Sequence, residues 1–226
     1  MNTPFSFTIR TQRDLINAVQ TFGVLPYFRN SIPGFSIEEH AAPSAWFSYE
    51  PGVWEWKGPV IRETGCAYGK FFEKKAAFVS REWFPDLANY RRDGYDFDAR
   101  YEDGLASYGD KQLYELVENN GPILSKHLKK IGDYRKGGRK GFDTSMNRLQ
   151  AQCYIVTSDF VYLTNKYCRE YGWGVAEYAT PEQVMGSAFT DAVYQRKPEE
   201  SYQRIAEHIK RLFPKTDDAA VQKFLK

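Results

Sequence analysis

The sequence predicts an α+β fold in which amphipathic helices alternate with short antiparallel β-hairpins. In the segment 11–22, Thr11 stands three residues before Asp14 and apolar residues follow at helical spacing, which predicts a capped helix. The segments 67–72 and 76–80 have the composition of strands and are separated by three residues, which predicts a hairpin. The chain has 226 residues, of which 42% are hydrophobic, so it is long enough to bury a sizeable core.

The first half holds a dense group of aromatic residues. Ser36 and Glu39 form a second capping box for a short helix, and Pro43 either ends that helix or starts a new one. The segment 46–56 combines aromatic residues with a Pro-Gly turn, and a further short helix is expected at 83–90. Because residues 91–104 are polar and acidic, they are interpreted as a connection that closes an aromatic-rich N-terminal α/β unit, residues 1–104.

The second half is more regular. Helices are predicted at 110–119, at 125–131 and at 143–152, the last with Asp143 as its cap, and strands at 153–163 and 173–178 enclose a polar tip. Three helices followed by a two-stranded hairpin is the order of a winged helix, a variant of the helix-turn-helix. Residues 105–180 are therefore expected to form a winged-helix unit, and residues 181–226 to form C-terminal helices that pack on the rest.

Charge is distributed unevenly, although the formal net charge is only +2. An acidic segment precedes a basic run that covers the second and third helices of the second half and the turn between them. The cations expected to bind DNA there and at the hairpin tip are Lys126, Lys129, Lys130, Arg135, Lys136, Arg139, Lys140, Arg148, Lys166 and Arg169. Such side chains bind phosphates and make affinity depend on salt. The alternatives are a solvated face without a partner and a winged helix that binds protein.

Several classes of function find no support in the sequence. The three cysteines are far apart, which indicates reduced thiols and a cytoplasmic protein without a disulfide framework. No signal peptide, membrane span or nucleotide-binding glycine motif is found. The histidines His40, His127 and His208 do not have the spacing of metal ligands, and His208 is expected on an exposed helix. No metal or other cofactor is therefore expected.

Two stretches resemble a known family. One contains Trp54-Glu55-Trp56 and the segment 67–80. The other contains Gly141-Phe142, the segment 149–160, Tyr171-Gly172-Trp173 and Thr180-Pro181-Glu182. Together they resemble proteins related to the AlkZ (YcaQ) DNA glycosylases. The resemblance implies tandem winged-helix units, the first of them degenerate here, and DNA binding linked to repair.

The resemblance also suggests a catalytic site. AlkZ-type enzymes excise alkylated bases with a Gln-x-Gln or Gln-x-Asp pair that positions water, and Gln150-Ala151-Gln152 has these letters. In the family that pair lies near the N-terminus, whereas here it ends a helix of the second half, where two polar residues are also ordinary. An extruded base would need an aromatic pocket, for which Trp46, Trp54 and Trp56 are the candidates.

The sequence thus supports three hypotheses. The preferred one is a winged-helix DNA-binding protein without catalysis of its own. The second is a DNA glycosylase of the AlkZ type that uses Gln150 and Gln152. The third is a protein-protein interaction module, because the aromatic-rich first half has the composition of an exposed apolar patch.

Overall fold

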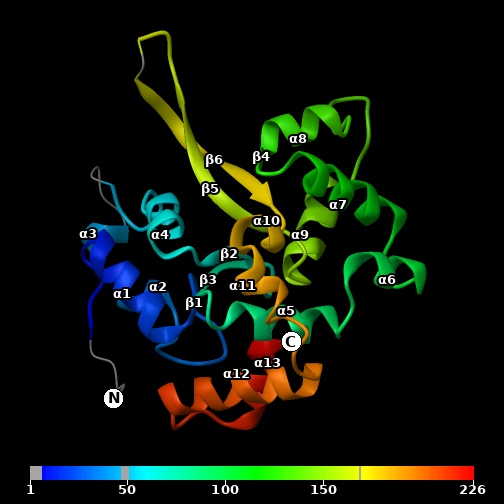
Figure 1. The fold of residues 1–226 in the computed structure, drawn as a ribbon. Coiled ribbons are helices and arrows are strands. Elements are labelled where there is room, and N and C mark those ends of the chain that lie inside the picture. Colours follow the sequence, from blue (N-terminus) through cyan, green and yellow to red (C-terminus); the bar gives the residue numbers. More distant parts are fainter. Residues whose placement is uncertain (1–6, 47–50, 168) are drawn as a thin grey trace.

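A computed structural model describes residues 7–46, 51–167 and 169–226. Helices surround one six-stranded sheet with the strand order β1-β3-β2-β5-β6-β4, and all its strand pairs are antiparallel (Figure 1). The α+β class predicted from the sequence is therefore confirmed. None of the described helices is both long enough and apolar enough to cross a membrane.

The first half contributes three strands of this sheet. Its elements are, in order, α1 (Gln12–Phe22), β1 (Val24–Pro26), α2 (Ile37–His40), α3 (Pro43–Trp46), α4 (Lys57–Thr64), β2 (Ala67–Phe72) and β3 (Lys75–Val79). The predicted capping box is present, because the Thr11 side chain accepts from the Asp14 N–H and Asp14 accepts from the Thr11 N–H. The helix α5 (Phe84–Arg92) and the short α6 (Phe97–Glu102) lead into the second half.

The second half contributes the other three strands. Its elements are α7 (Tyr108–Asn120), β4 (Ile123–Leu124), α8 (Ser125–Ile131), α9 (Phe142–Ala151), β5 (Val156–Thr164) and β6 (Glu170–Ala179). The β5–β6 hairpin is long, and its tip projects beyond the body of the molecule (Figure 1). The predicted helices and the hairpin are confirmed here, but the cap of α9 is Gly141 and not Asp143.

The two halves have the same topology. In each half a helix, a short strand, further helices and a hairpin follow one another, and the short strand pairs with the second strand of the hairpin. The first strands of the two hairpins, β2 and β5, pair with each other at Tyr68 and Thr157. The strands β1, β3 and β2 of the first half therefore correspond to β4, β6 and β5 of the second half. The two sets lie in mirrored order on either side of this junction.

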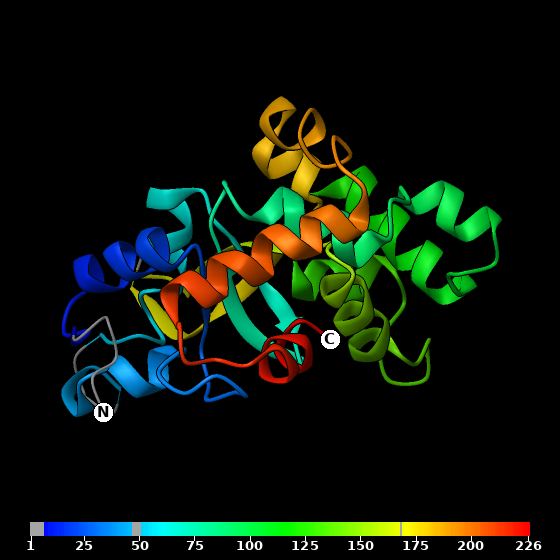
Figure 2. The same ribbon diagram turned by 90° about the horizontal axis from the view of Figure 1, so that it is seen from below.

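The C-terminal elements are α10 (Pro181–Met185), α11 (Ser187–Thr190), α12 (Pro198–Leu212) and α13 (Asp218–Leu225). Seen from below, α12 runs across the molecule with α13 beside it (Figure 2). Ile205 and Ile209 of α12 and Phe224 of α13 are fully buried in the same cluster as Phe22 and Phe78 of the first half. A second, smaller core around Leu113, Leu128 and Leu149 belongs to the second half.

The expectation that His208 is exposed was wrong. Only 9% of the residue is accessible, its ring stacks on Trp83 with centroids 4.0 Å apart, and its Nε2 lies 2.9 Å from the Phe22 carbonyl oxygen. The charged residues around His208 lie on the outer face of α12, whereas His208 lies on the face turned to α1 and α5. Charged residues next to His208 in the sequence do not determine which face of the helix His208 occupies.

Candidate functional site

The basic run is held by a few apolar anchors. Leu128 is the buried residue of α8, and the neighbouring Lys126 and Lys130 are exposed. The loop after α8 folds back on itself, because the Arg139 N–H donates to the Asp133 carbonyl oxygen at 2.8 Å. Gly138 is needed in this loop, since a Cβ there would lie 2.1 Å from the same oxygen. The loop therefore presents Arg135 and Lys136 to solvent.

Two of the predicted cations are engaged by acidic residues. Lys129 Nζ lies 3.7 Å from an Asp143 carboxylate oxygen and 4.5 Å from the centre of the Phe142 ring. Arg148 Nε lies 3.3 Å from Oδ2 of Asp110, whose side chain is only 2% exposed. These contacts hold α9 against α8 and α7, so both cations have a structural partner before any ligand binds.

The remaining cations of the basic run have no such partner. They are exposed, and no ion pair of the described residues includes them: Lys126, Lys130, Arg135, Lys136, Arg139 and Lys140. Because Tyr134 and Phe142 meet with ring centroids 5.2 Å apart, the loop and the start of α9 are adjacent. These six exposed cations, on α8 and on the loop that leads to α9, are here called the basic face.

The hairpin tip is a separate cationic element. Lys166 lies over the ring of Tyr167 at 4.9 Å, and Arg169 donates its backbone N–H to Asn165. Both cations are exposed, as are Tyr167 and Trp173, at 70% and 77%. In Figure 1 the tip and α8 both lie in the upper part of the molecule, and the α8–α9 loop lies on the far side of α8 from the tip. Lys166 and Arg169 thus lie on a different element from the other eight predicted cations, and DNA binding by the ten stays a prediction.

The three tryptophans suggested as pocket residues pack against the core of the first half. Trp46 and Trp54 are half-buried with ring centroids 5.1 Å apart, and Trp54 also stacks on Tyr27 at 5.4 Å. Trp56 is half-buried just before α4. In Figure 1, α3 and α4 lie on the other side of the β5–β6 hairpin from α8, so the structure does not bring these rings to the basic face.

The two glutamines suggested as a catalytic pair lie at the end of α9. Gln150 is 3% exposed, and its Oε1 accepts the backbone N–H of Lys70 at 2.8 Å. Gln152 is the half-buried C-cap residue of α9. The side chain of Gln150 is thus engaged at the junction of the two halves, and a catalytic role for the pair stays a prediction.

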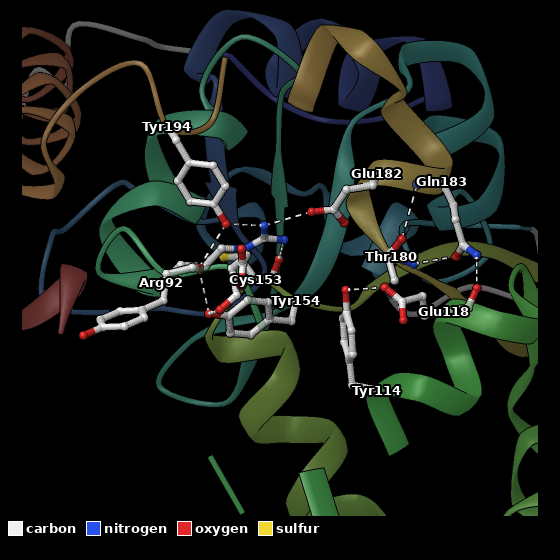
Figure 3. Close-up of polar contacts among 11 residues, drawn as sticks. Arg92, Tyr114, Glu118, Cys153, Tyr154, Thr180, Glu182, Gln183 and Tyr194 are labelled. Atoms are coloured by element: carbon white, nitrogen blue, oxygen red, sulfur yellow. Dashed lines mark hydrogen bonds and ion pairs between the residues drawn. The ribbon is translucent and has the colours of Figure 1, made fainter. Parts of the chain in front are cut away.

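A buried polar cluster around Arg92 was missed by the sequence analysis (Figure 3). Arg92 lies at the end of α5 and is 2% exposed. Its guanidinium group donates to Glu182 at 2.9 Å, to the Tyr194 hydroxyl at 3.0 Å and to the Cys153 carbonyl oxygen at 2.9 Å. Arg92 therefore joins α5, the end of α9 and the C-terminal segment. In the sequence, Arg91 and Arg92 form a pair at the end of a helix, which is typical of an exposed helix terminus. The burial of Arg92 was therefore not predicted.

The electrostatics of this cluster depend on burial and on two carboxylates. Burial lowers the pKa of Arg92, but Glu182 and Tyr194 outweigh burial and leave the pKa above its usual value. Burial, together with Glu182 and Glu118, raises the pKa of Tyr114 far above its usual range. Burial also raises the pKa of the Cys153 thiol to about 12. Arg92 is thus held charged, while the phenol and the thiol stay neutral at physiological pH.

Within residues 7–46, 51–167 and 169–226, no group of three or more His, Cys, Asp or Glu side chains is arranged to hold a metal ion. The basic face and the hairpin tip present hydrogen-bond donors and positive charge. Such groups suit an anionic ligand such as a phosphate.

Comparisons with known proteins identify a family for this chain. No curated protein and no solved structure matches the chain. A family described as AlkZ related matches residues 9–226, which include both halves of the sheet, the basic face and the C-terminal helices. The match covers nearly the whole chain, and this protein therefore belongs to the AlkZ-related family.

Proposed function

We propose that this protein binds DNA through the basic face and the tip of the β5–β6 hairpin. The observation that carries the proposal is the set of exposed cations on α8 and the following loop that form no ion pair among the described residues. Lysines and arginines that are not neutralised within the protein are available to displace counterions from phosphates. Membership of the AlkZ-related family supports the same ligand.

The topology supports a winged-helix architecture for this interface. The second half has the order helix, strand, helix, helix and hairpin, and its short strand β4 pairs with β6. The first half has three helices, α2, α3 and α4, between its short strand and its hairpin, and its short strand β1 likewise pairs with the second hairpin strand, β3. In a winged helix, the third helix and the hairpin are the parts that approach DNA. We therefore interpret the chain as two winged-helix units joined through β2 and β5.

The surface of α9 favours contacts with the DNA backbone over reading of bases. Its exposed residues are Asp143, Thr144 and Arg148, and Arg148 is engaged by Asp110. A helix with one acidic and one engaged basic side chain offers few donors to base edges in a groove. We expect binding with a steep dependence on salt and a weak preference for sequence.

The test is the affinity for a short duplex DNA, measured by fluorescence anisotropy at several salt concentrations. Replacing Lys130, Lys136 and Lys140 with Ala should weaken binding and lower the slope of log K against log salt by up to about 3, since each phosphate contact contributes about 1. The matched control replaces Arg211, Lys215 and Lys223, exposed cations near the C-terminus. If both triple variants bind as the parent protein does, the basic face is not the DNA-binding surface.

Base excision is a second candidate function, which family membership favours. The test is incubation of the wild-type protein with duplex DNA that carries alkylated bases, followed by detection of abasic sites. Gln152→Ala is the more informative variant, because the side chain of Gln150 is also bonded to β2. Excision activity that survives Gln152→Ala would remove this residue from the catalytic assignment.

A further inference from the structure

A cavity at the end of the molecule opposite to the hairpin tip has a chemistry different from that of the basic face. It lies between the end of α5, the start of α12 and α13, which meet at the bottom of the molecule in Figure 1, and its volume is about 320 Å³. Its polar lining residues are Tyr90, Asp93, Glu199, Tyr202, Gln203 and Gln222. A volume of this size is within the range of ligand-binding pockets.

The lining is rich in hydrogen-bond acceptors and contains no cation. Asp93 and Glu199 each supply a carboxylate, and Gln203 and Gln222 each supply an amide oxygen. None of these four side chains has a hydrogen-bond or ion-pair partner in the part of the chain that the structure describes. This differs from Asp86 and Asp110, for example, whose carboxylates are engaged by arginines.

Two aromatic rings complete the lining. Tyr90 of α5 and Tyr202 of α12 have ring centroids 5.1 Å apart and are inclined by 51°, so they meet as an angled pair. Burial, with contributions from Tyr90 and Asp218, raises the pKa of Tyr202. The electron-rich faces of such aromatic rings attract cations.

Two cations close to the aromatic pair of this cavity are already engaged. Arg91 lies 5.8 Å from the centre of the Tyr90 ring, but its guanidinium group donates to the carbonyl oxygens of Phe71 and Lys226 at 3.0 and 2.7 Å. Lys210 forms an ion pair with Asp218. Neither is a lining residue, and no other cation of the described residues lines the cavity beside the carboxylates of Asp93 and Glu199.

We propose that this cavity binds a guanidinium group, carried either by a free small molecule or by an arginine side chain of a polypeptide. A guanidinium group is planar, stacks on aromatic faces and has five N–H donors that can serve several acceptors at once. A carboxylate ligand would be repelled by Asp93 and Glu199, whereas a cationic ligand would be attracted by both. The site goes beyond the DNA-binding proposal and does not depend on it.

The test uses two probes that differ in charge but hardly in shape, N-acetyl-arginine amide and N-acetyl-citrulline amide. Each is titrated into the whole protein and followed by NMR through the ring signals of Tyr90 and Tyr202. We expect saturable binding of the arginine probe with a Kd on the order of 1 mM or lower, and at least about tenfold weaker binding of the citrulline probe. Equal affinities, or no saturation with the arginine probe, would overturn the proposal.

Variants locate the binding to the cavity. Asp93→Asn combined with Glu199→Gln should raise the Kd of the arginine probe at least about tenfold. Asn is suited to position 93, where the backbone has a φ of 55°. Glu207→Gln is the control, because Glu207 is an exposed carboxylate of α12, the helix that holds Glu199, but does not line the cavity. An unchanged affinity of the double variant would assign the binding to another place and overturn the proposal.

The source of the guanidinium group is decided by two further probes. Agmatine represents a free small molecule, and an acetylated Gly-Gly-Arg-Gly-Gly amide represents a polypeptide segment. Binding of the peptide at least about tenfold more tightly than the amino-acid amide supports a polypeptide ligand, whereas tighter binding of agmatine supports a small one. DNA affinity should be unchanged in the double variant. A failure of guanidinium binding can therefore be distinguished from a failure of DNA binding.

Discussion

The side-chain carbonyl oxygen of Gln150 accepts the backbone N–H of Lys70 at 2.8 Å, across the junction where the two halves of the sheet meet. A buried amide can therefore tie α9 of one half to β2 of the other. The contact gives a structural reason for a glutamine at position 150 that is independent of catalysis.

Gln150→Ala should lower the free energy of unfolding by about 1–3 kcal/mol, because it leaves the Lys70 N–H without its partner at a part-buried site. Gln152→Ala, in a half-buried residue at the C-cap, should change it by about 0.5 kcal/mol or less. Urea denaturation followed by tryptophan fluorescence measures both. Equal losses for the two variants would contradict the structural role assigned to Gln150.

Arg148→Ala should also destabilise the fold, by about 1–3 kcal/mol, because it leaves the buried carboxylate of Asp110 without its cation. Lys126→Ala removes an unpaired, exposed cation and should change stability by about 0.5 kcal/mol or less. Thermal unfolding of the two variants provides the comparison. A stable Arg148→Ala variant with weakened DNA binding would instead place Arg148 among the DNA contacts.

Arg92→Met should be among the most damaging single substitutions, with a loss of about 3–5 kcal/mol, because it leaves Glu182 without its buried cation and the Cys153 carbonyl without its donor. Arg196→Met is the matched control, since Arg196 is a more exposed arginine 3.6 Å from Asp86. Denaturant unfolding distinguishes the two, and similar small losses would show that the cluster of Figure 3 is not a major source of stability.

His208 should make stability depend on pH. Burial lowers its pKa below the usual value of about 6.5, so the unfolded chain binds a proton more readily than the folded protein. Stability is therefore expected to fall as the pH drops below about 6.5 towards the pKa of the folded state. His208→Gln, which keeps a donor for the Phe22 carbonyl, should flatten the profile between about pH 7 and 5. An identical slope in both proteins would assign the effect to other groups.

The hairpin tip should contribute to DNA binding independently of the basic face. Replacing both Lys166 and Arg169 with Ala should weaken binding on all duplex sequences alike and lower the salt slope by up to about 2. Anisotropy titrations on two unrelated duplexes measure this. A loss confined to one duplex would indicate that the tip reads bases instead of contacting phosphates.

Local patterns in the sequence determined much of the secondary structure. The Thr11–Asp14 capping box, the Ser36 cap of α2 and the β2–β3 hairpin are all present, because caps and turns depend on residues a few positions apart. The basic character of residues 126–140 was also evident, since it needs no knowledge of distant contacts. The helix α4, which follows an aromatic segment and has Gly58-Pro59 in its first turn, was not predicted.

Only the tertiary structure decided which polar groups are available. It engaged Arg148 with Asp110, buried Arg92 and His208, and turned Gln150 towards Lys70. It also left Asp93 and Glu199, far apart in the chain, beside one cavity. The physical reason is that burial and pairing arise from residues brought together over 38 to 186 positions, as for Arg148 with Asp110 and His208 with Phe22, and no local pattern encodes such contacts.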